Sequence, residues 1–314
     1  MNRDAKIFVA GHGGFVGSAI VRALRQRGCS RLILKPKSEL DLRDALQVQY
    51  LFRKEQPEYV FLTAAHVGGS EANRERPADL IRDNLMIQHN VIDASYQTSV
   101  KKLLFLGSAC LYPKHATQPM KEHALLTGAL EEANEPYSIA KIAGIKMCQA
   151  YNKQYQTRYI TAMPTKLYGL HHPNDGLHAS NTLAALFQRF HEATQRKLPH
   201  VEILGSRESK SEFLHVDDLA DACLFLMDRY EDSEIINVGT GIEVTLRELA
   251  EKIKAITGYL GEIVYTAHAE AEADRIVDIA KINGLGWQAD IKLDEGLRSV
   301  YAWVLRNESL LTKH

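Results

Sequence analysis

Three side chains in this sequence have the types and spacing that suit the transfer of a proton and a hydride at a carbonyl group. Ser108 follows the apolar run 102–106, which is typical of a buried parallel strand. Tyr137 and Lys141 are four residues apart in a segment that reads as a helix, so both side chains lie on one face. Ligands of open α/β sheets bind at the carboxyl ends of the strands, where Ser108 is expected.

A glycine-rich segment near the beginning of the chain makes this interpretation specific, because a Tyr-x-x-x-Lys pair alone occurs by chance in many helices. Gly11, Gly14 and Gly17 are spaced three apart, with a strand before them and a helix after them. The first glycine allows a tight turn, the second allows backbone to approach a pyrophosphate, and the third allows the helix to lie close to the strand. The predicted dinucleotide loop consists of Gly11, His12, Gly13, Gly14, Phe15, Val16 and Gly17.

The end of the second predicted strand, 31–35, favours NADP(H) over NAD(H). A carboxylate there would bind the ribose 2′-hydroxyl of NAD, whereas cations accommodate the 2′-phosphate of NADP. This sequence has Lys35 and Lys37, and its first acid, Glu39, comes later. Further predicted cofactor contacts are Asp41, Leu42, Ala64, Ala65, Leu106, Gly107, Lys141, Pro164 and Leu167. Asn84 and Asn90, in the helical stretch 77–95, are expected to bind backbone groups.

Composition excludes several classes of protein. The 314 residues are 45% hydrophobic and 25% charged, with a formal net charge of −1, which argues against binding to nucleic acid. The longest apolar runs are too short to cross a membrane, and the chain enters a strand at once, so no signal peptide is expected. Four scattered cysteines without metal-type spacing predict reduced thiols, a cytoplasmic location and no metal site.

The order of predicted elements indicates an α/β protein. Strands and helices alternate up to residue 168, which predicts a Rossmann-type, doubly wound parallel sheet. We expect residues 1–168 to form an NADP-binding domain that carries the Ser/Tyr/Lys set. Residues 169–314 are expected to form mainly a smaller α/β lobe for the substrate, with some strands and helices returning to the main sheet. Within this lobe, 201–204 is predicted as an isolated strand.

Several segments together resemble those of the extended short-chain dehydrogenases, and more closely those of the GDP-L-fucose synthase family. The segments are AAHVGG (64–69), KLLFLGSACLYPK (102–114), NEPYSIAKIAGIK (134–146), MPTKLYG (163–169) and FLHVDDLADA (213–222). The resemblance covers nearly the whole chain. It implies that NADPH reduces C4 of a GDP-4-keto-6-deoxy sugar after epimerisation at C3 and C5.

The resemblance also implies a role for each site residue. Tyr137 would donate a proton to the C4 oxygen, Ser108 would bind that oxygen, and Lys141 would hold the nicotinamide ribose. Cys110 would be the epimerisation base, and we expect it to point to the same side as Ser108 if the segment is extended. Lys141 is expected to lower the pKa of Tyr137. The substrate contacts implied are Val67, Gly68, Ser108, Ala109, Cys110, Arg189, Lys210, Ser211 and Arg275.

The sequence departs from the family pattern at positions near the sugar and the phosphates. The family has a second serine before the cysteine, an Asn-Ser-His with the histidine as epimerisation acid, an arginine before Glu-Phe-Leu-His, and an arginine in the glycine loop. The residues here are Ala109, Asn181-Thr182-Leu183, Ser211 preceded by Lys210, and Gly13. His178 is the nearest candidate for the acid. Where the family has two basic residues near Val277-Asp278, this sequence has only Arg275. The family's arginine on the helix that faces the phosphates is present here as Arg189.

Relatives of this fold commonly form homodimers through the helix that carries Tyr137 and the helix before it. The apolar positions that we expect at such an interface are Ile87, Val91, Ile92, Ile142, Ile145 and Met147. Three other functions stay open at this point: a C4 reductase without epimerisation or for a related deoxyheptose or dideoxyhexose, a nucleotide-sugar epimerase with retained NAD, and a non-catalytic NADP-binding regulator.

Overall fold

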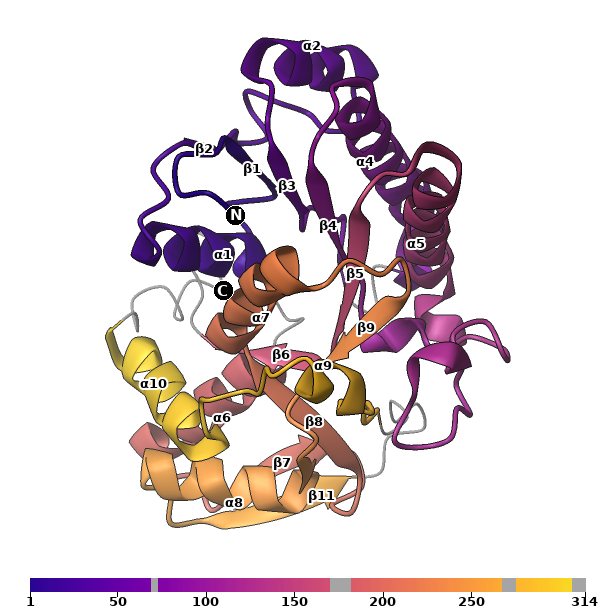
Figure 1. Ribbon diagram of the computed structural model, residues 1–314. Helices are drawn as coiled ribbons and strands as arrows, with labels where there is room; N and C mark the ends of the chain where they lie inside the picture. Colours follow the sequence, from indigo (N-terminus) through magenta and orange to yellow (C-terminus); the bar gives the residue numbers. More distant parts are fainter. Residues whose placement is uncertain (69–72, 170–181, 267–274, 307–314) are drawn as a thin grey trace.

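Six parallel strands form the main sheet of the computed structural model, which describes residues 1–68, 73–169, 182–266 and 275–306 (Figure 1). Their order across the sheet is β2-β1-β3-β4-β5-β9. The strands are β1 (Ile7–Ala10), β2 (Leu32–Ile33), β3 (Tyr59–Leu62), β4 (Lys102–Leu106), β5 (Tyr159–Pro164) and β9 (Ile235–Val238). The direction of winding reverses between β1 and β3, which is where such sheets bind their ligands. The predicted doubly wound fold is confirmed.

Alternate residues of each strand face opposite layers of helices. Ile7 and Val9 of β1 pack on one face, and Phe8 and Ala10 pack on the other. The first face is covered by α1 (Phe15–Gln26) and α7 (Val216–Arg229), and the second by α2 (Ala45–Glu55), α4 (Pro77–Gln97) and α5 (Glu135–Tyr155). Both faces of the sheet are thus buried, which is why its strands read as continuous apolar runs.

A smaller lobe lies below the main sheet in Figure 1 and has its own apolar core. Its three-stranded sheet, in the order β10-β8-β6, consists of β10 (Glu243–Thr245), β8 (Lys210–His215) and β6 (Lys166–Tyr168). Around it lie α6 (Thr182–Arg196), α8 (Leu246–Thr257) and α10 (Leu293–Arg306), whereas α9 (Ala280–Gly284) packs against β9 of the main sheet. The strand predicted as isolated is not: β7 (His200–Leu204) pairs in parallel with β11 (Glu262–Thr266).

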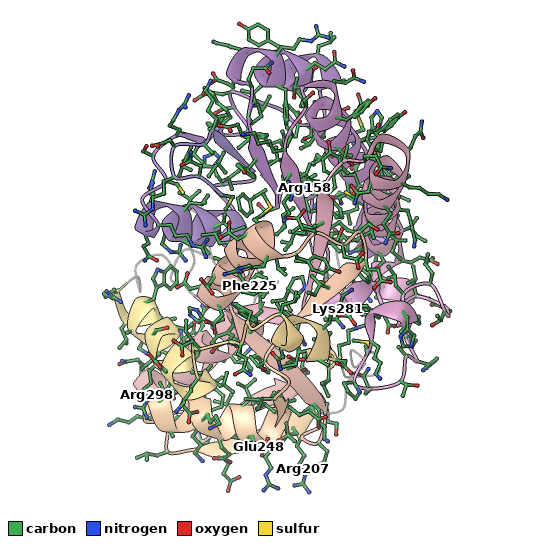
Figure 2. The ribbon with its side chains drawn as sticks, viewed as in Figure 1. Arg158, Arg207, Phe225, Glu248, Lys281 and Arg298 are labelled. Carbon is green, nitrogen blue, oxygen red and sulfur yellow. The ribbon has the colours of Figure 1, made fainter. Side chains whose placement is uncertain are left out.

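Local sequence rules determine where α8 begins and ends. The Thr245 hydroxyl accepts a hydrogen bond from the Glu248 amide, and the Glu248 carboxylate accepts one from the Thr245 amide, so the two residues form a capping box. Glu248 is labelled in Figure 2. Gly258 ends the helix with a φ of 71°, a left-handed conformation that glycine adopts without strain.

A buried lysine joins the main sheet to the chain segment that returns from the smaller lobe. Lys102, the first residue of β4, is 2% exposed, and its Nζ donates hydrogen bonds to the carbonyls of Leu226, Met227 and Tyr230. These carbonyls lie at the C-terminal end of α7, where a cation is favourable. Nζ also lies 3.2 Å from the Glu231 carboxylate, which accepts a hydrogen bond from Arg158 (Figure 2). Burial lowers the pKa of Lys102.

The two asparagines of α4 bind backbone groups, as predicted. Asn84 accepts a hydrogen bond from the His66 amide and donates to the His66 carbonyl, and Asn90 donates to the Leu42 carbonyl. These bonds hold the segments after β3 and before α2, at the edge of the sheet where the cofactor contacts are predicted. Buried amide side chains thus fix two loops that have no regular secondary structure.

The apolar positions predicted for a dimer face are largely needed inside one chain. Val91, Ile92, Ile142 and Ile145 are buried in the core beneath α4 and α5, so the expectation that these four lie at an interface is wrong, whereas Ile87 and Met147 are partly buried. The exposed apolar side chains of these helices are Leu85, Met86, Ile139 and Tyr155. In the described residues, no helix is both long and apolar enough to span a membrane.

Candidate active site

A cavity of about 300 Å³ opens at the carboxyl ends of β4 and β5. Eight of the predicted site residues line it: Val67, Gly68, Ser108, Ala109, Cys110, Tyr137, Ser211 and Arg275. Five further residues complete the lining: Asn73, Glu131, Asn134, Thr165 and Lys166. The wall therefore combines hydroxyl, thiol, phenol, carboxylate and cationic groups, which is the mixture expected for a polar ligand that undergoes proton transfer.

The chain turns sharply where β4 ends, and residues 108–112 form what we call the active-site turn. Ser108 is still extended, but Ala109–Leu111 form a 3₁₀ turn. Ser108 Oγ caps this turn by accepting a hydrogen bond from the Cys110 amide at 3.3 Å. The expectation of an extended segment is therefore wrong, because the backbone curls after Ser108. The turn nevertheless brings Ser108 and Cys110 to one cavity.

Helix α5 lies close to β4 because Gly144 leaves room for it: a Cβ there would come within 2.6 Å of the Phe105 ring. Gly107, after β4, lies equally close to β5, because a Cβ on it would come within 2.4 Å of Met163 Sδ. Lys141, one turn before Gly144, is 3% exposed, and its Nζ lies 4.1 Å from the centre of the Phe105 ring. Burial lowers the pKa of Lys141 to about 7, while Cys110 and Cys148 oppose the shift.

Tyr137 has the opposite pKa shift from the one expected. Burial raises the pKa of its phenol, and the neighbouring Cys110 raises it further. Proximity to Lys141 was expected to lower this pKa, but removal from water determines the direction of the shift, and Lys141 is not among its causes. A raised pKa keeps the phenol protonated at neutral pH, as a proton donor must be, but it also makes the phenol a weaker acid. Tyr137 lines the cavity together with Ser108 and Cys110.

The glycine loop has the shape that a dinucleotide requires. Gly11 has a φ of 89°, and a Cβ there would lie 2.7 Å from the Ala64 amide nitrogen. A Cβ on Gly17 would lie 2.0 Å from the Gly11 carbonyl oxygen, so this glycine lets α1 pack on the loop itself. Within the described part of the chain, no side chain caps α1 at Gly14, and His12 Nδ1 is buried without a hydrogen-bond partner. An uncapped helix N-terminus behind a backbone cradle fits a pyrophosphate.

The lysines after β2 lie closer to an acid, Glu39, than the sequence pattern indicated. Strand β2 ends at Ile33, so Lys35 and Lys37 lie in the following segment. Lys35 Nζ forms an ion pair with Glu39 at 2.8 Å, which brings the first acid back to the predicted 2′-phosphate position. Asp41, predicted near the adenine, pairs with Arg43, and this pair lowers the pKa of Asp41 to about 2.

Some predicted substrate residues lie away from the cavity lining. Arg189 is exposed on α6, and Lys210 pairs with Glu243 on the neighbouring strand at 2.6 Å. His178 lies outside the described residues. Arg275 lines the cavity, but its guanidinium also donates hydrogen bonds to the carbonyls of Ala109 and Tyr112, at 3.3 and 3.1 Å.

Two of the residues that sequence reasoning missed carried a usable pattern. Thr165 and Lys166 directly follow the apolar segment that forms β5, so the strand-end rule that selected Ser108 would have selected them too. Glu131 and Asn134 come from a polar loop with no such mark. Glu131 lies 3.2 Å from Lys114 and 4.0 Å from Arg275, which places an ion-paired carboxylate in the cavity wall.

Comparison with known proteins agrees with this geometry. The model of the NAD dependent epimerase/dehydratase family matches residues 7–239. The chain is 50% identical to GDP-L-fucose synthase 1 of Arabidopsis thaliana over 309 residues, covering 98% of this chain and 95% of the relative. It is 47% identical to GDP-L-fucose synthase of Escherichia coli (strain K12) over 315 residues, covering 96% and 97%. The chain belongs to the GDP-L-fucose synthase family of NAD-dependent epimerases and dehydratases.

Solved structures similar to this member of the GDP-L-fucose synthase family include enzymes that act on heptoses. A GDP-D-glycero-L-gluco-heptose synthase from Campylobacter jejuni, solved with NADPH, is 37% identical with a TM-score of 0.90, and the match covers 97% of this chain and 99% of the other. A GDP-mannoheptose C4 reductase from the same organism, with NADP bound, is 40% identical with a TM-score of 0.88 and the same coverage.

Proposed function

We propose that this protein reduces C4 of a GDP-4-keto-6-deoxy sugar with NADPH, after epimerisation at C3 and C5. The observation that carries the proposal is the single cavity lined by Ser108, Cys110 and Tyr137, with the Lys141 ammonium buried behind them. GDP-L-fucose synthases that match 96–98% of the chain, at 47–50% identity, support the sugar nucleotide.

Ser108, Tyr137 and Lys141 each have a separate role in the reductive step. Ser108 donates a hydrogen bond to the C4 oxygen, and Tyr137 gives this oxygen its proton. Lys141 holds the ribose of the cofactor. NADPH, when bound, supplies the hydride that goes to C4. The glycine loop with its uncapped helix, and the NADP or NADPH bound in two related structures, support this cofactor.

Epimerisation needs a base on one face of the sugar and an acid on the other. The C4 ketone acidifies the protons on C3 and C5, and Cys110 is the proposed base. The proposed acid is His178. Arg189, Lys210, Ser211 and Arg275 are proposed for the diphosphate and the sugar, and Lys166 adds a cation that lines the cavity.

A C4 reductase without epimerisation is the second candidate. Two observations favour it: the heptose C4 reductase at 40% identity, and the absence of histidine after Asn181-Thr182 in the sequence. Product NMR after incubation with GDP-4-keto-6-deoxymannose and NADPH tests both. We expect a C4 alcohol with inverted C3 and C5. A C4 alcohol with unchanged C3 and C5 would establish the second candidate, and no NADPH oxidation would contradict both.

We further propose that the enzyme is a cytoplasmic homodimer. Exposed apolar side chains on α4 and α5, Leu85, Met86, Ile139 and Tyr155, support association through these helices. Four cysteines without disulfides support a reducing compartment. A monomer mass at micromolar concentration in light scattering would contradict the dimer.

A further inference from the structure

A carboxylate with no role in the proposed chemistry lies directly behind the substrate cavity. Glu212 follows the cavity residue Ser211 on β8 and is 0% exposed. Its Oε1 accepts hydrogen bonds from the amides of Thr240 and Gly241 at 2.6 and 2.8 Å, and its Oε2 accepts one from the Val277 amide at 3.0 Å. One side chain on β8 thus binds two segments that are far apart in the sequence, 240–241 and 277.

The space around this carboxylate is closely fitted. A Cβ on Gly239 would lie only 2.1 Å from Glu212 Oε1, so glycine at this position lets the loop after β9 reach the carboxylate. Burial raises the pKa of Glu212, whereas the three amides act in the other direction by stabilising the charged form. Burying a carboxylate among backbone donors costs desolvation free energy, so we expect this carboxylate to have a structural or functional role.

The Val277 amide belongs to residues 275–278, which we call the strap. The strap is fixed along its length: Gln118 Oε1 accepts a hydrogen bond from the Ile276 amide at 2.9 Å, and Met120 exchanges backbone hydrogen bonds with Ile276 and Asp278. Arg275, at the beginning of the strap, donates to the Ala109 and Tyr112 carbonyls of the active-site turn. Glu212 is therefore connected to the turn that carries Ser108 and Cys110 by hydrogen bonds at both ends of the strap and by the strap's own backbone between them.

We propose that Glu212 is a positioning residue, which fixes the strap so that Arg275 holds the active-site turn in place against the substrate. The substrate readout of this inference rests on the function proposed above, whereas its structural readout does not. Charge-assisted hydrogen bonds to backbone amides are short and strong, and a satisfied buried network favours one arrangement over its neighbours. Glu212 acts on the reaction only through Arg275 and the turn, without touching the reacting atoms.

Glu212→Gln separates positioning from space filling, because it keeps the volume and removes one acceptor oxygen. The amide nitrogen of the new side chain must face either Val277 or the Thr240 and Gly241 amides, and donors that face each other cannot bond. We expect KM for the GDP-sugar to rise about tenfold. The dissociation constant for NADPH should change less than about twofold, because the glycine loop lies on other elements.

A double-mutant cycle tests whether the effect passes through Arg275. Arg275→Met should raise KM as well, and Glu212→Gln should add little in that background, because coupled residues are not additive. The matched control is Asp218→Asn on α7. Asp218 is also a buried carboxylate, and it accepts hydrogen bonds from the amides of Asp290 and Ile291, which are not part of the cavity lining. We expect this variant to lower the melting temperature and leave KM unchanged.

The alkylation rate of Cys110 reports on the turn without any substrate. Cys110 is partly exposed, whereas Cys29, Cys148 and Cys223 are buried. Loosening the turn should raise the rate with iodoacetamide severalfold in Glu212→Gln and Arg275→Met, but not in Asp218→Asn. Gln118 is exposed, and Gln118→Ala removes the side chain that accepts the hydrogen bond of the Ile276 amide. This variant should raise the alkylation rate too, and it replaces Glu212→Gln if that variant does not fold.

The outcomes distinguish this inference from the proposed function. Three outcomes would each overturn the positioning role. In the double variant, the increases in KM of the two single variants could multiply. KM could rise equally in Asp218→Asn, or the alkylation rate could stay unchanged in both Glu212→Gln and Gln118→Ala. Faster alkylation in these variants, in an enzyme that reduces no GDP-4-keto sugar, would keep the positioning role and refute the function.

Discussion

The cofactor side and the substrate side of this active site are built in different ways. On the cofactor side, the cradle consists of seven consecutive residues, Gly11 to Gly17, and its shape depends on backbone and on missing side chains. The substrate cavity is lined by residues between positions 67 and 275 that come from six separate stretches of chain. Its strap is held by single side chains such as Glu212 and Gln118. The first side depends on local conformation, and the second depends on tertiary hydrogen bonds.

The largest expected effect lies where the two sides meet. Tyr137→Phe should lower kcat for carbonyl reduction by about two to four orders of magnitude, the usual contribution of a general acid. NADPH affinity should stay within about twofold. Single-turnover NADPH oxidation and a fluorescence titration measure the two quantities. Tyr151→Phe, which removes a phenol of α5 bonded to Asp93 and absent from the cavity lining, is the matched control. Near-normal turnover in Tyr137→Phe would remove the reductase assignment.

A smaller effect should be confined to the substrate side. Cys110→Ser should slow epimerisation by about a hundredfold, because a hydroxyl is a far weaker base than a thiolate, and it should spare hydride transfer to a sugar that needs no inversion. Deuterium uptake at C3 and C5 in D₂O without NADPH measures the first reaction. No uptake by the unmodified enzyme, with C4 reduction intact, would identify a reductase without epimerase activity.

Lys141 should make the apoprotein less stable at acidic pH. Its pKa is about 7 in the folded chain and 10.5 in the reference state, so the unfolded chain binds more protons between these values, and stability rises with pH across this window. Lys141→Met should therefore stabilise the protein by a few kcal/mol below pH 7, with a gain that shrinks toward pH 10. Urea unfolding at pH 6 and pH 9 checks this. An equal gain at both values would contradict the assigned pKa.

The smallest effects should appear at the edge of the cofactor site. Lys35→Ala with Lys37→Ala should weaken NADPH binding about tenfold and NADH binding little, because only NADPH has a 2′-phosphate. Glu39→Gln should strengthen NADPH binding by up to about fivefold, because Lys35 then loses its competing partner. Isothermal titration with both cofactors measures the ratio. Equal affinities of the unmodified enzyme for NADPH and NADH would refute this interpretation of the lysines.

The contrast between the two sides also explains what the sequence could predict. The glycine loop, the strand ending at Ser108 and the Tyr137–Lys141 spacing are local patterns, and each lies where it was expected. The curl after Ser108 was missed because a 3₁₀ turn and an extended segment have the same short apolar signature. The pKa of Tyr137 was misjudged because burial depends on the whole fold.

Long-range partners account for most of the remaining differences. Glu39 forms an ion pair with Lys35, and Lys210 forms one with Glu243. The second pair joins β8 to β10, and the sequence did not predict that these strands pair. Glu131 enters the cavity from a loop with no periodicity to mark it. The sequence could not tell whether the apolar residues of α4 and α5 face the core or an interface, because both kinds of residue have the same pattern. In the structure, Val91 and Ile145 are buried in the core.

The buried Lys102 has a consequence for how the chain could be divided. Its ammonium is held by three carbonyls and a carboxylate that come 124 to 129 residues later in the chain. A fragment that stops at residue 168 would contain the glycine loop, Ser108 and Lys141, yet it would lack every group that binds this ammonium in the folded chain. The two halves therefore cannot be exchanged like interchangeable modules: a chimera with another substrate lobe must also bring carbonyls that receive this lysine.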